Sequence, residues 1–171
     1  MKKLLIALLC IFFLSQSAQA ASEGGILDLT PKLFEQIVED FKKTLELDIS
    51  KIGPTSAWSA EVDGKMAASL IFEERNGYVS RIQTVTRRVK TDKKNHDKYV
   101  ALEAKMLMLT SVLITQAKLG EAVDLVKRLS GEQTPMIIDI GKSRIAMTVR
   151  ANDENFVTFI DIIPVTPYMK Y

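Results

Sequence analysis

Residues 57–90 read AWSAEVDGKMAASLIFEERNGYVSRIQTVTRRVK, and their side chains alternate between apolar and polar over most of this length. Two dipeptides, Asp63-Gly64 and Asn76-Gly77, interrupt the alternation. Both tolerate the positive φ angles that two-residue hairpin turns require. The stretch therefore predicts three antiparallel strands joined by two tight hairpins.

The register of these hairpins decides which side chains share a face. Counting outward from the two turns places Ile71 opposite Ile82 and Trp58 opposite Ser69. One face then carries Trp58, Ala60, Val62, Ala67, Ser69, Ile71 and Ile82, and the other carries Met66, Ala68, Leu70, Phe72, Val79, Val85 and Val89 among Arg81, Gln83 and Arg87. Both faces are partly apolar, and neither is identified as the solvent side.

The flanking segments add helices and a second group of strands. Thr30-Pro31 is a typical helix start, and apolar residues at spacings of three and four predict a helix from there to about Leu47. Residues 99–119 are apolar almost all round, which predicts a largely buried helix, and a shorter amphipathic helix covers 121–129. Clean alternation then predicts strands at about 134–140, 143–151 and 155–163, with an apolar face of Met136, Ile138, Ile140, Ile145, Met147, Val149, Ile160 and Ile162.

The predicted order is α-βββ-αα-βββ. We interpret residues 21–171 as a single α+β domain, in which an antiparallel sheet built from two three-stranded meanders carries packed helices. The pattern leaves open whether the meanders join edge to edge or stack as two sheets.

The first twenty residues, MKKLLIALLCIFFLSQSAQA, have the layout of a secretory signal peptide. Two lysines precede eleven apolar residues, and Ala18-Gln19-Ala20 resembles a cleavage site. Eleven apolar residues are too few for a transmembrane anchor, which needs about 20. We therefore expect cleavage after Ala20 and a periplasmic or secreted protein. Because Cys10 would leave with the leader, the exported chain would have no cysteine for disulfides or thiol chemistry.

The charge balance does not indicate a nucleic-acid partner. Of the 23 basic residues, Lys2 and Lys3 lie in the leader, so the exported chain would carry 21 basic and 21 acidic side chains. Basic residues are nonetheless concentrated in 75–98, where eight stand against two acids. Six of them are candidates for partner binding: Arg81, Arg87, Arg88, Lys90, Lys93 and Lys94. They could meet an acidic protein or an anionic envelope component, or they could simply guard a solvated strand edge.

Few residues form the pattern of a catalytic or metal site. His96 is the single histidine, and we expect it to be exposed in the first turn of a helix. Zinc needs three or four nitrogen or sulfur ligands, which the exported chain would lack. Asp139 and Asp161 could approach each other across the second meander, although ion pairs with Arg144 or Arg150 are the simpler expectation. The sequence therefore predicts no catalytic residue, no metal ligand and no cofactor.

Two functions remain open at this stage. The first is a small exported, non-catalytic binding protein of the inhibitor, immunity or envelope-chaperone type, with a homodimer as a further option. The alternative is a carrier of a small apolar or lipid ligand between helix 99–119 and the first meander. Its ligand would contact Leu70, Phe72, Met106 and Met108, since methionine adapts to irregular ligands. A hydrolase using carboxylates is a more distant third.

Overall fold

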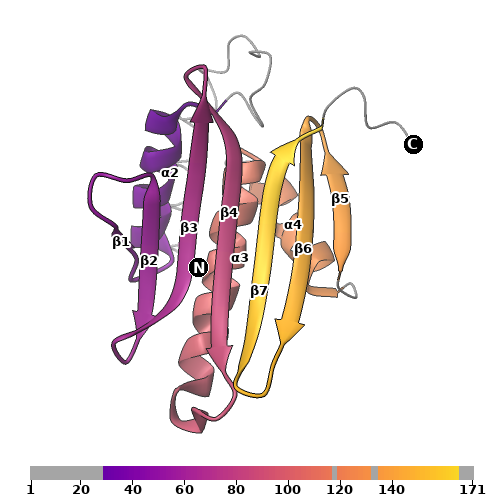
Figure 1. The fold of residues 1–171 in the computed structure, drawn as a ribbon. Coiled ribbons are helices and arrows are strands. Elements are labelled where there is room, and N and C mark those ends of the chain that lie inside the picture. Colours follow the sequence, from indigo (N-terminus) through magenta and orange to yellow (C-terminus); the bar gives the residue numbers. More distant parts are fainter. Residues whose placement is uncertain (1–28, 117–118, 132–134, 166–171) are drawn as a thin grey trace.

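The computed structural model describes residues 29–116, 119–131 and 135–165. The predicted leader, its cleavage site and Cys10 lie outside these ranges. Within them, one seven-stranded antiparallel sheet carries the α-helices on one of its faces (Figure 1). This arrangement confirms the α+β class and the predicted order of elements, with one short strand added.

The helices lie together behind the sheet in the view of Figure 1. Helix α2 spans Pro31–Thr44 and is capped by the hydroxyl of Thr30, which accepts a hydrogen bond from the Leu33 N–H at 3.3 Å. A 3-10 turn, η1 (Lys93–Asn95), leads into α3 (His96–Ile114), and α4 spans Leu119–Gly131. The last six residues of α3 are all buried, including the polar Thr110 and Ser111, as the largely apolar sequence of this helix predicts.

The seven strands form a single sheet rather than two stacked ones. They are β1 (Ser50–Lys51), β2 (Ala57–Val62), β3 (Lys65–Arg75), β4 (Tyr78–Val89), β5 (Met136–Ile140), β6 (Ser143–Ala151) and β7 (Asn155–Pro164). Their spatial order is β1-β2-β3-β4-β7-β6-β5. Strands β4 and β7 pair from Ile82↔Ile162 to Val89↔Asn155, so the two meanders join edge to edge.

The two hairpin turns of the first meander form where the sequence predicts them. Asp63 and Gly64 have φ angles of 49° and 73°, and Asn76 and Gly77 have φ angles of 55° and 80°. Positive φ at both central residues is the geometry whose twist matches that of the flanking strands.

The predicted register of these hairpins is wrong by one residue. Trp58 lies opposite Leu70 rather than Ser69, and Ile82 lies opposite Phe72 rather than Ile71. The physical reason is a β-bulge in each hairpin, which adds one unpaired residue to one strand and shifts the alternation of side chains.

The bulges also determine which side chains face the helices and which lie on the opposite face of the sheet, here called the open face. In the first hairpin the extra residue is Ala67, because Ala60 pairs with Ala68 while Glu61 pairs with Met66. In the second it is Ser80, because Glu73 pairs with Arg81 while Glu74 pairs with Val79. The predicted faces are therefore corrected: the helix side carries Trp58, Ala60, Ala68, Leu70, Phe72 and Ile82, and the open side carries Met66, Ser69, Ile71 and Val85.

The core lies between the sheet and the helices. Under the first meander, the ring of Phe34 in α2 packs against Trp58 and Phe72, with centroids 5.5 and 4.6 Å apart. In the second meander, most residues of the predicted apolar face are buried against the helices, which confirms that face. Val149 differs, because 37% of it is exposed. A buried hydrogen bond of 2.7 Å between the hydroxyls of Thr84 and Thr110 joins β4 to α3.

Within the described ranges, no helix is both long and apolar enough to cross a membrane.

Candidate functional site

One face of the sheet is left uncovered by every helix and strand of the described residues, and it faces the viewer in Figure 1. Four large apolar side chains are exposed on it: Met66 (61%), Ile71 (37%), Ile137 (69%) and Phe159 (37%). Scattered exposed apolar residues are ordinary, but several on one face are typical of an interaction surface. The charged groups on this face differ between its upper and lower halves.

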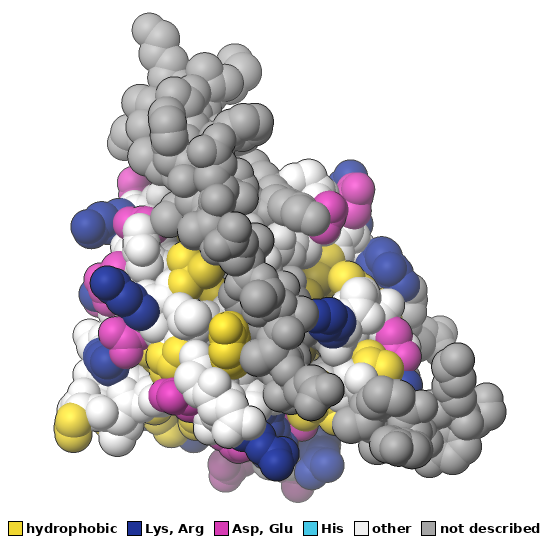
Figure 2. Space-filling view, turned by 90° about the horizontal axis from the view of Figure 1, so that it is seen from above, with side chains coloured by type: hydrophobic (Ala, Val, Ile, Leu, Met, Phe, Trp, Pro, Cys, Tyr) yellow, Lys and Arg dark blue, Asp and Glu magenta, His cyan; other side chains and the backbone are white. Residues whose placement is uncertain are grey.

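Ion pairs neutralise the upper half of the open face. The Arg81 guanidinium donates to both carboxylate oxygens of Asp161 at 2.8 and 2.9 Å and also contacts Glu73 at 3.2 Å. Arg144 donates to both oxygens of Asp139 at 2.8 and 2.9 Å, which lowers the pKa of that carboxyl. Seen from above, basic and acidic side chains are intermixed around this end of the molecule (Figure 2). No excess of one charge marks a partner here.

The lower half of the open face differs, because its two arginines have no acidic partner among the residues that the structure describes. Arg87 on β4, Val157 on β7 and Arg150 on β6 lie side by side across three strands. The Arg87 Nε donates to Asn155 Oδ1 at 3.0 Å, and the Arg150 guanidinium lies 5.5 Å from the ring centroid of Phe159. Neither arginine forms an ion pair with another described residue. Their charges are thus available to a ligand.

A hollow of about 120 Å³ lies beside Arg87, and Val157 on its lining separates it from Arg150. The bulge in β3 explains its position: Ala67 and Ala68 are consecutive, and both are buried. Between Met66 and Ser69, therefore, no side chain projects from the open face, and a gap remains that regular alternation would fill. The hollow is lined by Met66, Ala67, Ala68, Ser69, Val85, Arg87 and Val157. We call this group, together with Arg150 and Phe159, the arginine hollow.

The six basic residues singled out from the sequence do not form one surface. Arg81 is held in the upper ion pairs, and Arg87 lies at the arginine hollow. Arg88 is on the helix side of the sheet, where its guanidinium and the Lys90 ammonium lie 4.9 and 4.5 Å from the ring centroid of Phe156. Lys93 and Lys94 are exposed on η1. Strand alternation separates Arg87 from Arg88 by placing neighbours on opposite faces.

The residues of the carrier hypothesis belong to the hydrophobic core. Leu70, Phe72 and Met106 are buried, and Met108 is partly buried against them. Ligand binding there would require these side chains to move apart, because they all belong to one packed hydrophobic cluster.

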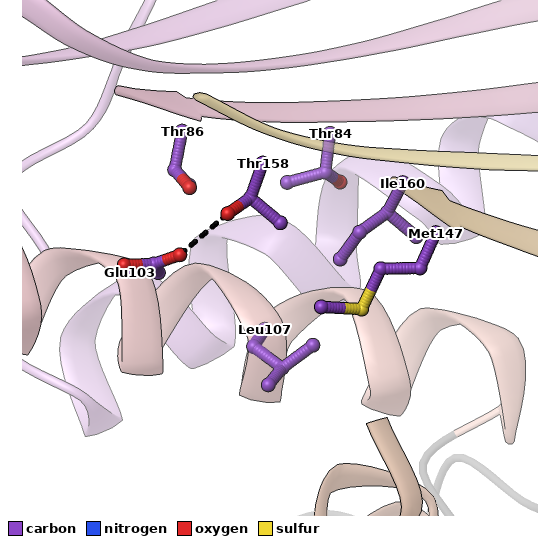
Figure 3. Close-up of a pocket in the computed structure, with 7 residues that line it drawn as sticks. All are labelled: Thr84, Thr86, Glu103, Leu107, Met147, Thr158 and Ile160. Carbon is purple, nitrogen blue, oxygen red and sulfur yellow. Dashed lines mark hydrogen bonds between the residues drawn. The ribbon is translucent and has the colours of Figure 1, made fainter. Parts of the chain in front are cut away.

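A small cavity does lie between α3 and the sheet (Figure 3). It measures about 30 Å³, which is room for water rather than for a lipid. Glu103 reaches across it and accepts a hydrogen bond of 2.6 Å from the Thr158 hydroxyl, while the nearby Thr86 hydroxyl is buried without a protein partner. A water molecule bound here would satisfy Thr86.

Other candidate groups have structural partners. Asp139 binds Arg144, as the simpler expectation has it, whereas Asp161 binds Arg81 rather than Arg144 or Arg150. His96 is exposed at the start of α3, as expected. An open cleft of about 350 Å³ near the β2–β3 turn contains Asp63, whose pKa is lowered mainly by its hydrogen bond from Lys98 at 3.0 Å. The described residues contain no group of three or more metal-ligating side chains.

Sequence reasoning finds only part of the arginine hollow. It selects Arg87 and places Arg150 on the less apolar face, but it has no means of bringing them together. That juxtaposition depends on the pairing of β4 with β7, two strands separated by about 65 residues. The hollow itself depends on the bulge at Ala67, for which the sequence contains only the weak signal of two adjacent alanines.

The fold and site together define a small α+β protein with a one-sided helical layer and an open, partly apolar sheet face. Comparison of the chain with protein-family models, with curated proteins and with solved structures gives no match.

Proposed function

We propose that this protein is a small exported, non-catalytic binding protein that holds an acidic protein partner at the arginine hollow. The observation that carries the proposal is the position of Arg87 and Arg150, which flank Val157 beside the hollow without an ion pair to any described residue. Export is supported by the signal-peptide pattern of residues 1–20.

The chemistry of the partner follows from these groups. A guanidinium binds carboxylates in a planar, two-pronged geometry and is less strongly hydrated than an ammonium, which suits it to interfaces. The hollow has room for about one apolar side chain, and such a side chain anchored in a pocket commonly dominates binding. A protein surface with an apolar residue between carboxylates meets both requirements, and inhibitors, immunity proteins and chaperones all bind such surfaces.

A photocrosslinking experiment in the producing cell tests the proposal. A photoreactive amino acid is placed at Met66, at the edge of the hollow, and irradiation is followed by mass spectrometry of the adducts. We expect one predominant protein adduct, and we expect the double variant Arg87→Glu/Arg150→Glu to reduce it by about tenfold or more, because two attractive charges become repulsive. The purified double variant should remain folded by circular dichroism, since both side chains are exposed.

A matched control separates this site from general charge effects. The double variant Lys43→Glu/Lys127→Glu makes the same change in net charge on exposed helical residues away from the open face. It should leave the adduct unchanged. An adduct that persists in the arginine variant would remove the arginine hollow from the proposal, and an adduct consisting only of phospholipid would replace the protein partner with an anionic membrane surface.

A further inference from the structure

The two edges of the sheet are protected to different degrees. Strand β1 is two residues long and is followed by Gly53-Pro54, and its Lys51 is ion-paired to Glu35 at 2.7 Å. Short strands, prolines and lysines are devices that prevent one sheet edge from pairing with another. Strand β5, at the other edge, has five residues, of which four are apolar. Its Ile137 is the most exposed large apolar side chain of the described residues, at 69%.

The outer edge of β5 also presents free hydrogen-bonding groups. The two-residue turn Gly141-Lys142 makes Ile140 and Ser143 a hydrogen-bonded pair, and such pairs alternate along an antiparallel ladder. The N–H and C=O groups of Ile137 and Asp139 consequently point away from β6. Neither residue has a further backbone hydrogen bond within the described parts of the chain. Four strong hydrogen-bonding groups therefore line this edge.

We propose that β5 pairs antiparallel with β5 of a second copy of this chain, about a two-fold axis that passes beside Ile138. In this register the N–H of Ile137 donates to the C=O of Asp139 in the second copy, and the N–H of that Asp139 donates back to the C=O of Ile137. The two-fold symmetry gives a second such pair, between Asp139 of the first copy and Ile137 of the second. Four hydrogen bonds in total therefore satisfy the N–H and C=O groups of Ile137 and Asp139 in both copies. The two sheets become one continuous sheet.

The strand sequence favours this axis over its neighbours. An axis beside Ile137 would place Asp139 opposite Pro135, which has no N–H to donate, and one C=O of each copy would remain unsatisfied. An axis beside Asp139 would place two carboxylates directly opposite each other. With the axis beside Ile138, each Asp139 faces the apolar Ile137 of the other copy and keeps its ion pair with Arg144. The strand is thus complementary to itself, as a two-fold interface requires.

The expected interface is small. A pair of five-residue strands extends about 17 Å, so the contact falls in the class that buries less than about 1,200 Å² in total. We therefore expect a reversible dimer that forms at micromolar to millimolar protein concentration. This inference does not depend on the arginine hollow, whose residues lie on other strands.

Sedimentation velocity of the purified protein over this concentration range tests the proposal. We expect a concentration-dependent shift from monomer to dimer, and the variant Ile137→Pro should abolish it. This proline removes an N–H that points away from β6, so no hydrogen bond within the sheet is lost. The matched control Lys51→Pro alters the opposite edge and should dimerise normally. A protein that stays monomeric at millimolar concentration, or an Ile137→Pro variant that dimerises like the native chain, would overturn the proposal.

Two further variants guard against misfolding and test the register. Ile137→Lys keeps the backbone donor but adds an edge charge, and it should also prevent dimerisation. In the exported chain, which the leader would leave without cysteine, Ile138→Cys should form an intermolecular disulfide, because residues on the axis lie about 4.5 Å apart between Cα atoms. Lys51→Cys should not. Failure of Ile138→Cys to cross-link in a dimerising protein would reject this register.

Discussion

The two meanders are both antiparallel hairpin pairs, yet one is irregular and the other is regular. Strands β2 to β4 contain a bulge in each hairpin, whereas β5 to β7 pair without a register shift. The irregular meander turns two adjacent alanines inward and so leaves a hollow on the open face. The regular meander ends in a straight edge strand with free backbone groups. The bulge in the first meander thus leaves a hollow that can receive a side chain of a partner. The regular second meander leaves free backbone groups with which another strand can pair.

The largest expected effect tests how much each face of the sheet contributes to stability. Phe72→Ala removes a buried ring that contacts Phe34 at 4.6 Å between centroids, and we expect a loss of about 3–5 kcal/mol in the free energy of unfolding. Urea denaturation measures it. Phe159→Ala, on the open face, should cost less than about 1 kcal/mol because that ring is 37% exposed. Equal losses would mean that the open face is packed in solution.

Deleting Ala67 converts the irregular β2–β3 hairpin into a regular one and leaves the bulge at Ser80 in place. Without the extra residue, Glu61↔Met66 and Ala60↔Ala68 become consecutive pairs, so no other side chain needs to change face. We expect a folded protein that is destabilised by about 1–3 kcal/mol, because Ala67 packs with Val62 and Tyr99. The Met66 photocrosslink should disappear as the hollow closes. Its persistence at native yield would show that the bulge is not needed for binding.

The ion pair of Arg81 and Asp161 tests the junction of the two meanders, since it links β4 to β7. Each side chain is 35% exposed, and solvent weakens the pair accordingly. A double-mutant cycle with Arg81→Gln and Asp161→Asn should give a coupling energy of about 0.5–1 kcal/mol, measured by chemical denaturation. Zero coupling would show that β4 and β7 are held together by the backbone and core alone.

The smallest effect is a difference in sensitivity to acid. The pKa of Asp63 is lowered chiefly by its hydrogen bond from Lys98, and that of Asp139 by its hydrogen bonds from Arg144. A carboxylate with a lowered pKa stabilises the fold fully above its ordinary pKa of 3.8, and this contribution is lost as the pH falls through the lowered value. Unfolding midpoints measured from neutral pH down to about pH 2 should therefore fall less steeply in Asp63→Asn and Asp139→Asn. Unchanged slopes would contradict these pKa shifts.

The sequence predicts the second meander better than the first for a simple reason. Strand alternation and turn residues are local signals, and β5 to β7 follow them without a bulge, so their strand ranges are correct to within two residues and their core face is correct except at the exposed Val149. In the first meander the turns at Asp63-Gly64 and Asn76-Gly77 are equally well predicted. The bulges at Ala67 and Ser80, however, have no distinctive local signal, and each one reverses the assignment of every residue beyond it.

The candidate site is less predictable than the fold because it depends on long-range pairing. A run of basic residues is visible in the sequence, but folding distributes its members over both faces of the sheet and over η1. Arg81 is not available to a partner because it binds Asp161, a residue 80 positions away in the sequence. Arg150 gains importance only because β6 lies beside β7, and β7 beside β4.

The position of β7 has a consequence for how the molecule is made. It is the last strand of the described residues, yet it lies inside the sheet between β4 and β6. Until residues 155–164 have been synthesised, the strands can form only two separate groups, each with an unpaired inner edge. Assembly of the sheet is therefore a late, long-range event, of the kind that slows folding. A nascent chain that ends before residue 155 would remain open and vulnerable to proteases.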